Sequence, residues 1–265
     1  MVFLCRNQPE NLLCNVKADN FGTEKFMTDI HPPLLLIDTS TRVCSVAVAA
    51  AGTIISQRVS HVGNSHAANI GVFVQEVLTE ATGLGAKPSI VALSSGPGSY
   101  TGLRIGSSIA KGLCFGLGIP LVSVPTLELI AEAARPLSQP DWLICPMIDA
   151  RRMEVYTALF DSKGKALTDT LPLVIDNNSF SEELQRRNIL FVGDGAEKCR
   201  PFLSHPNAHF SENVIHPLAL YMLHPALSRI ETSSYEDVAY WEPFYLKEFV
   251  ATVAKNKVIP RTQTT

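Results

Sequence analysis

The fold is decided by residues 34–50, which read LLLIDTSTRVCSVAVAA. The first five residues are an apolar run that ends in an acid, which is typical of a buried strand, and the hydroxyl residues after Asp38 favour a turn. A second apolar run fills residues 43–50, and TIISQRVS (53–60) follows directly after Ala51-Gly52. Three short strands joined by tight turns predict an antiparallel meander.

Alternating helices and strands follow this meander. The spacing of apolar residues predicts a helix over 66–82, capped by Ser65, and a buried strand over 90–95. A glycine-rich turn at 96–102 leads into a predicted helix over 103–118, a strand over 120–124 and a helix over 126–134. The first half of the chain is therefore predicted to have the order βββαβαβα.

The same pattern then begins again. LICPMID (143–149) is another apolar strand that ends in an acid, and EVYTALF (154–160) follows after a short turn. We expect a third strand within 166–175, a helix over 179–187, a strand over 189–193 and a helix from 196. Two βββαβα halves in tandem predict an α/β protein with the two-lobed, actin-like architecture of the ribonuclease-H-like (ASKHA) group.

Breaks in the periodicity predict the domain limits. The segment RPLSQPD (135–141) separates an N-terminal lobe, residues 34–135, from a C-terminal lobe, residues 136–250. Residues 1–33 are interpreted as a flexible tail or a mis-assigned start, with Met27 as the alternative first residue, and residues 251–265 as a disordered tail. A helix over 216–230 is expected to break at Pro225.

The composition excludes several classes of protein. The formal net charge of −3 and the pI near 6.2 lack the basic excess of a protein that grips nucleic acid alone. Six scattered cysteines without a C-x-x-C pair predict buried thiols in a reducing compartment, so we expect a cytoplasmic protein. No apolar run reaches the length that spans a bilayer, which predicts no membrane association.

Asp38 and Asp149 end equivalent strands of the two halves. In an actin-like ATPase such acids hold Mg²⁺ near the phosphates. The alternative, slightly favoured for Asp38, is that the carboxylate binds backbone amides of its own turn. Asp149 has the same two interpretations, and Arg151 and Arg152 offer it a local ion pair.

The segment GPGSYTG (96–102) is the sharpest motif. Gly96 and Gly98 permit close backbone approach, Ser99 and Thr101 can cap the following helix, and Arg104 is the nearby cation. These residues, with Asp38, are the candidate nucleotide or anion site. The alternative is a tight strand-to-helix turn whose hydroxyls satisfy the helix's own amides, because the lysine of a Walker loop is absent.

The predicted helix over 103–118 is apolar nearly all round, so more than one of its sides must be covered. Burial within the chain and burial against a second chain are both open. No spacing of histidines, cysteines and acids predicts a metal site, and no nucleophile–base motif predicts a catalytic residue.

Four segments carry a resemblance to the TsaB (YeaZ) family: LLIDTSTRVCSVAV, ALSSGPGSYTGLRIGSSIAKGLCFGLGIPLVSVPTLELIA, MIDARRMEVYTALF and YLKEFVA. The resemblance covers about residues 34–250. It implies the actin-like fold and a role in making threonylcarbamoyladenosine at position 37 of tRNA, as a non-catalytic scaffold or activator of the related catalytic subunit TsaD.

The resemblance also implies partners. A TsaD-like paralogue would pair with the helices over 66–82 and 103–118, a TsaE-like ATPase would join, and tRNA would be met only through the complex. Without the partner, the same helices would form a homodimer. The predicted interface residues are Ile70, Phe73, Val74, Val77, Leu103, Ile109 and Leu113. No cofactor is required of this chain; ATP or ADP at the subunit junction is left open.

The TsaD family holds its metal with two histidines spaced H-x-x-x-H, and this chain has Thr126 and Ile130 at the matching positions. Neither offers an imidazole, so metal-dependent catalysis by this chain is not expected. The alternative functions are an actin-like ATPase or small-molecule kinase, which needs acids at both Asp38 and Asp149, and a peptidase, which no motif supports.

Overall fold

The computed structural model describes residues 31–246, except 64–65 and 214. Of the predicted tails, residues 1–30 of the first (1–33) and all of the second (251–265) lie outside the described residues. The meander forms as expected, with β1 (Leu34–Asp38), β2 (Cys44–Ala50) and β3 (Thr53–Ser60). It is followed by α1 (His66–Gly83), β4 (Ile90–Ser94), α2 (Tyr100–Leu117), β5 (Leu121–Val124) and α3 (Thr126–Ala134). The short 3₁₀ helix η1 spans Arg135–Leu137.

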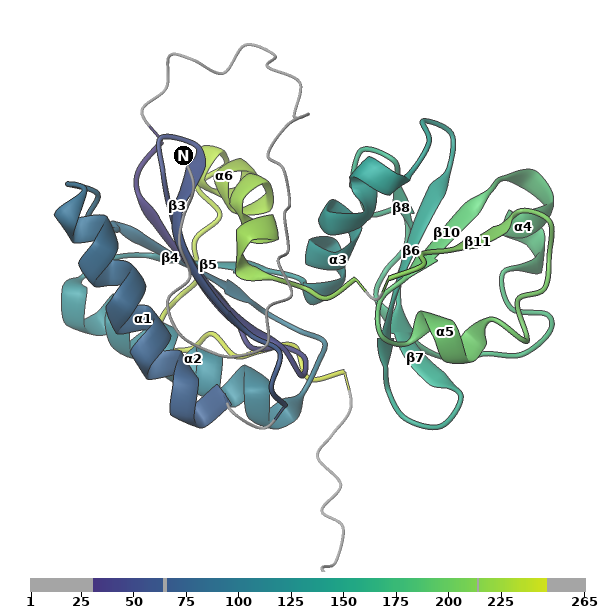
Figure 1. Ribbon diagram of the computed structural model, residues 1–265, viewed down its shortest axis with the longest axis horizontal. Helices are drawn as coiled ribbons and strands as arrows, with labels where there is room; N and C mark the ends of the chain where they lie inside the picture. Colours follow the sequence, from purple (N-terminus) through teal and green to yellow (C-terminus); the bar gives the residue numbers. More distant parts are fainter. Residues whose placement is uncertain (1–30, 64–65, 214, 247–265) are drawn as a thin grey trace, which may run out of the picture. The chain divides into compact units, whose positions relative to one another are not determined.

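The first sheet has the strand order β3-β2-β1-β4-β5. β1 pairs antiparallel with β2 and parallel with β4, and β4 pairs parallel with β5. All five residues of β1 and of β4 are buried, because helices cover both faces of the sheet. Helices α1 and α2 pack on one face and α6 on the other (Figure 1).

The second half repeats this topology. Its strands are β6 (Leu143–Asp149), β7 (Glu154–Thr157), β8 (Phe160–Asp161), β9 (Leu171–Val174), β10 (Ile189–Val192) and β11 (Ala208–Phe210). The order β11-β10-β6-β7-β9 is that of the first sheet read in reverse, with the same parallel and antiparallel pairings; β8 pairs with β6 outside this path. The predicted internal repeat and the α/β fold class are confirmed.

The helices of the second half are short: α4 (Ser181–Arg186), α5 (Ala196–Cys199), η2 (Ala219–Met222) and α6 (Leu223–Glu231). The predicted break at Pro225 is wrong, because α6 runs through this residue. Pro225 lies in the first turn of α6, where the amide that proline lacks needs no helical acceptor. The strand β11 was not predicted, since its three residues, AHF, are too few to give a periodic pattern.

Two helices pack on the sheet of the other half. Helix α3 directly precedes the predicted boundary, yet Leu127, Ile130 and Ala134 lie in one core cluster with residues of β6 and β10. Helix α6 comes from the second half, and Ala226 and Leu227 pack against the first sheet. The ranges given above for the two lobes stay a prediction. In the structure, each sheet is packed against a helix from the other half of the sequence.

The chain returns to the first sheet after α6. Residues 235–246, named here the C-terminal strap, pair with β5 through a bridge between Leu121 and Glu236. The Phe244 amide donates to the Ser95 carbonyl oxygen at 2.7 Å. None of the helices in the described part of the chain combines the length and apolar character that a bilayer crossing needs.

Candidate functional site

Asp38 is fully buried at the end of β1. Its Oδ1 accepts hydrogen bonds from the hydroxyl (2.7 Å) and the amide (3.3 Å) of Ser40. Ser94 lies beside it at the end of the parallel strand β4. The carboxylate therefore organises its own turn, as the structural alternative in the sequence analysis proposed.

Burial disfavours the charged form of this carboxyl group. It raises the pKa of Asp38 to about 6, although the neighbouring hydroxyls of Ser94 and Ser40 act in the opposite direction. Within the described residues, neither Asp38 Oδ2 nor Ser94 Oγ has a hydrogen bond of good geometry. A group with a pKa of about 6 is still largely ionised at neutral pH, so it is the contact of Asp38 with Ser40, and not a loss of charge, that favours the structural role.

The glycine-rich turn is filled by the chain itself. A Cβ atom added at Gly98 would overlap the Ser40 carbonyl oxygen, and one added at Gly102 would overlap that of Thr39. The amide of Ser99 donates to the Ser40 oxygen at 2.6 Å, and the Thr39 hydroxyl donates to the Gly102 oxygen at 2.8 Å. These glycines are needed because the β1–β2 turn lies directly against them.

The other residues of the candidate anion site have separate roles. Ser99 is the N-cap of α2 and accepts from the Gly102 amide at 3.2 Å. Thr101 is exposed in the first turn, and Gly96 has a positive φ and lies against the Phe244 carbonyl oxygen. The Arg104 guanidinium lies over the Tyr100 ring, 4.4 Å from its centroid. The described contacts bring Gly98 and Ser99 to the turn that Asp38 organises, and direct Arg104 to Tyr100. Their use as an anion site stays a prediction.

Asp149 occupies the position in the second half that matches Asp38, but its surroundings favour the charged carboxylate, whereas those of Asp38 disfavour it. It is exposed, forms an ion pair with Lys198 from α5, and accepts from the Arg151 amide at 2.8 Å. Partial burial would raise the pKa of Asp149, but the hydrogen bonds from Lys198 and Arg151 hold it below its ordinary value. Lys198 also donates to the carbonyl oxygens of Arg152 (2.8 Å) and Glu154 (2.7 Å).

Lys198 was missed by the sequence analysis, because nothing in the sequence connects it with an acid 49 residues earlier. The Lys198 ammonium group is paired with Asp149, whereas an ATPase or kinase would need this carboxylate to be free to bind a metal. Asp38 and Asp149 thus stabilise two turns in different ways. The ATPase or kinase alternative needs both carboxylates to hold a cation, and in this structure both are engaged by the chain itself. Among the described residues, no three side chains of His, Cys, Asp or Glu are grouped as a metal site.

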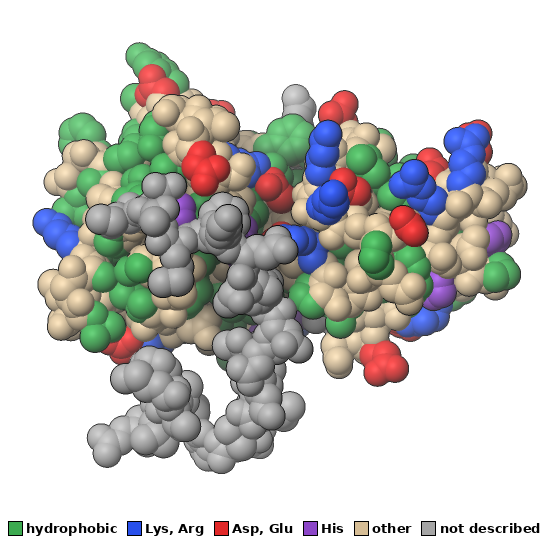
Figure 2. Space-filling view, turned by 90° about the horizontal axis from the view of Figure 1, so that it is seen from above, with side chains coloured by type: hydrophobic (Ala, Val, Ile, Leu, Met, Phe, Trp, Pro, Cys, Tyr) green, Lys and Arg blue, Asp and Glu red, His purple; other side chains and the backbone are tan. Residues whose placement is uncertain are grey.

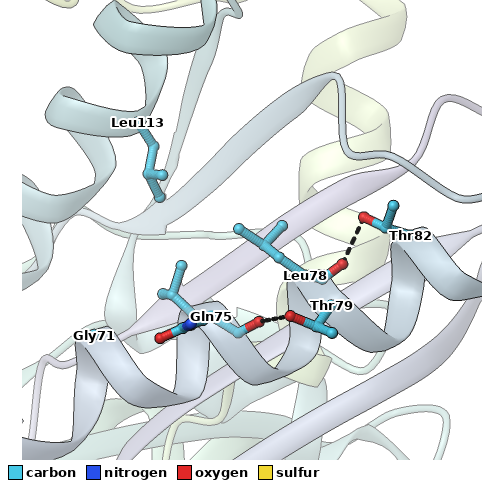
Figure 3. Close-up of a pocket in the computed structure, with 7 residues that line it drawn as sticks. Gly71, Gln75, Leu78, Thr79, Thr82 and Leu113 are labelled. Carbon is cyan, nitrogen blue, oxygen red and sulfur yellow. Dashed lines mark hydrogen bonds between the residues drawn. The ribbon is translucent and has the colours of Figure 1, made fainter.

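A second candidate site lies on α1 and α2. Of the predicted interface residues, Ile70, Val74, Val77 and Leu103 are buried in the chain's own core, whereas Phe73, Ile109 and Leu113 are half-buried at its edge. An open groove of about 540 Å³ runs between the helices. Figure 3 shows Leu78 of α1 and Leu113 of α2 pointing toward this groove.

The threonine hydroxyls of the groove are already bonded within α1. The Thr79 hydroxyl donates to the Gln75 carbonyl oxygen at 2.8 Å, and the Thr82 hydroxyl donates to the Leu78 carbonyl oxygen at 2.7 Å. Both bonds are drawn as dashed lines in Figure 3. Apart from the exposed Gln75 side chain, the groove therefore presents aliphatic side chains and methyl groups, which suit an apolar partner surface.

Two further expectations concern buried positions. The four described cysteines, Cys44, Cys114, Cys145 and Cys199, are free and buried, as predicted, and burial raises the pKa of each to about 11 or 12. Thr126 and Ile130 are both buried on α3, and Ile130 packs in the core cluster on the second sheet.

Comparison with known proteins gives a consistent family. The family model TsaD, tRNA N6-adenosine threonylcarbamoyltransferase, matches residues 54–254. The tRNA threonylcarbamoyladenosine biosynthesis protein TsaB of Bacillus subtilis is 34% identical over 166 residues, 60% of this chain and 70% of that protein. Its Escherichia coli counterpart is 30% identical over 223 residues, 82% of this chain and 96% of that protein.

The solved structure of YeaZ from Pseudomonas aeruginosa agrees in fold, with a TM-score of 0.69 and 26% identity, and it covers 82% of this chain and 100% of its own. The sequence matches, the shared fold and the paired halves described above lead to one assignment: the chain belongs to the TsaB (YeaZ) family.

Proposed function

We propose that this protein is a non-catalytic partner in the threonylcarbamoyl modification of tRNA adenosine, acting with a TsaD-like catalytic paralogue. The observation that carries the proposal is the contrast between its two candidate sites. The strand-end acids Asp38 and Asp149 are engaged in the chain's own turns. The α1–α2 surface, by contrast, leaves an apolar groove open.

The α1–α2 surface is the proposed interface with the paralogue. Phe73, Ile109 and Leu113 would contact the partner, because each is half-buried and lies at the edge of the core. Ile70, Val74, Val77 and Leu103 would support them from beneath. In the absence of the paralogue, the same surface would form a homodimer; a TsaE-like ATPase would complete the assembly, with ATP or ADP at the subunit junction as the open alternative.

A reconstituted modification assay tests the function. Unmodified tRNA, threonylcarbamoyl-adenylate, the paralogue, the ATPase and ATP are combined with and without this chain. Modified adenosine that forms only when the chain is present, and none when the chain acts without the paralogue, is the expected result. Product made without the paralogue would contradict the non-catalytic role, and unchanged product would contradict the role as a partner.

The interface is tested by Phe73→Asp and Ile109→Asp, with Val174→Asp as the control. Val174 is an exposed apolar residue on β9, so its substitution adds the same charge away from the groove. We expect the first two variants, but not the control, to lose the complex in size-exclusion chromatography while keeping the circular dichroism of the parent. Complex formation by folded Phe73→Asp and Ile109→Asp would refute this interface.

A further inference from the structure

Asp38 is an exception among the charged residues of this protein. Acidic and basic side chains are spread over the surface, as on the face that Figure 2 shows, but in the described part of the chain Asp38 is the one Asp, Glu, Lys or Arg that is buried. Proteins rarely bury an acid completely unless a cation compensates its charge. Among the described residues, no lysine, arginine or histidine forms an ion pair with Asp38. The positive charge that Asp38 needs must therefore come from elsewhere.

Two serines flank Asp38 on the same face of the first sheet. Ser45 of β2 is its partner in the antiparallel pair, and Ser94 of β4 directly follows the paired residues Ile37 and Leu93. Because side chains alternate between the faces of a sheet, all three point to the face on which η2 and α6 pack. Both serines are 1% exposed. These three side chains are named here the buried oxygen row.

The chain leaves several oxygens of this region unpaired. Within the described residues, Asp38 Oδ2 and Ser94 Oγ are shielded from solvent without a hydrogen bond of good geometry, and so is Thr126 Oγ1 at the start of α3. Ser45 Oγ accepts from the Ala219 amide at 2.8 Å, so the first residue of η2 lies over the row. A buried polar atom without a partner costs free energy, which a bound water or ion removes.

The donor atoms and the charge of the row select the ligand. Carboxylate and hydroxyl oxygens are hard donors, which suit hard cations and not zinc or copper. The row has one formal negative charge, which a monovalent ion neutralises, whereas a divalent ion would leave a buried positive charge. We propose that the buried oxygen row binds Na⁺ or K⁺ through Asp38 Oδ2 and the hydroxyl oxygens of Ser94 and Ser45. The ion compensates the buried carboxylate and joins β1, β2 and β4 beneath η2.

Ion-dependent unfolding of the full-length chain tests the proposal. Urea unfolding at neutral pH is followed by circular dichroism in lithium, sodium, potassium or thallium(I) acetate, with choline acetate keeping the ionic strength constant. An ion that binds only the folded chain lowers the unfolding constant by up to about tenfold for each tenfold rise in its concentration, once the site is filled. We expect this dependence for Na⁺ or K⁺, and the ion that acts at the lower concentration is the ligand.

Three variants connect this dependence with the row. Asp38→Asn removes the charge, Ser94→Ala removes one hydroxyl, and Asp149→Asn is the matched control, because Asp149 is the equivalent strand-end acid and is paired with Lys198. In choline acetate, where no small ion compensates the carboxylate, Asp38→Asn should be more stable than the parent, and the difference should shrink as Na⁺ or K⁺ is added. Ser94→Ala should need a higher ion concentration than the parent, and Asp149→Asn should respond as the parent does.

Anomalous diffraction locates the ion without any substitution. Thallium(I) is a heavy monovalent cation, and in crystals of the parent chain we expect its anomalous peak in contact with Asp38 Oδ2 and Ser94 Oγ. The proposal is overturned if the parent shows no dependence on Na⁺ or K⁺, or if Asp38→Asn shows the same dependence as the parent. Thallium(I) that stabilises the chain in solution but binds elsewhere in the crystal, with water beside Asp38, would also overturn it and make a buried water the partner of the row.

Discussion

Replacing Gly102 by alanine tests whether the glycine-rich turn serves the chain's own packing. Gly102 is buried in the first turn of α2, and its Cβ position is occupied by the Thr39 carbonyl oxygen. The added methyl group must push the β1–β2 turn away from the helix, and the buried hydrogen bond of 2.8 Å from the Thr39 hydroxyl to Gly102 is then lost.

The magnitude follows from three contributions. Overpacking of a well-packed core costs roughly 1–3 kcal/mol. A buried hydroxyl left without its partner costs roughly 1–3 kcal/mol more. Alanine has a higher helix propensity than glycine by about 1 kcal/mol, which offsets part of the loss. We therefore expect Gly102→Ala to lower the free energy of unfolding by about 1–5 kcal/mol.

Chemical denaturation monitored by circular dichroism measures the effect, and Gly112→Ala is the matched control. Gly112 lies on the same helix, and apart from its chain neighbours and the backbone of its own helix no heavy atom lies within 4 Å of its Cβ position. Only the propensity difference acts there, so the control should gain up to about 1 kcal/mol. Gly102→Ala as stable as the parent would refute the reasoning and reopen the interpretation of the turn as a ligand cradle.

Three further predictions concern the ionisable groups. Asp38→Asn should raise the melting temperature at neutral pH. Because the folded pKa of about 6 exceeds the ordinary 3.8, stability is lost as pH rises between these values; a gain that does not shrink from pH 7 toward pH 4 would contradict this. Lys198→Met should lower the free energy of unfolding at neutral pH by about 1–2 kcal/mol, since three acceptors lose their donor. Its loss should be smaller in acid, where Asp149 is protonated; an equal loss at both pH values in denaturant titrations would argue against the ion pair. Arg229→Met should cost about 1–3 kcal/mol, because it leaves Glu128 half-buried without its two hydrogen bonds; Arg186→Met, whose ion pair is exposed, should change the same measurement by less than about 0.5 kcal/mol.

Much of the fold could be predicted because its signals are local. The apolar runs that form β1, β2, β4 and β6 are long enough to be recognised one at a time, and their order revealed the repeat. The weakest predictions fell in the second half, where β9 has a single half-buried residue and β11 has three residues. Their pairing depends on neighbouring strands and not on their own pattern.

The sequence by itself determined the tandem α/β halves, the positions of the two strand-end acids and the resemblance to the TsaB family, because each depends on residue type and spacing along the chain. The tertiary structure alone decided what those residues do. It brought Lys198 to Asp149, pressed Thr39 and Ser40 against the glycines, and placed Tyr245 on Tyr100. Each of these contacts joins segments tens of residues apart or more, so their distance and burial, which set charge and accessibility, exist only after the chain has folded.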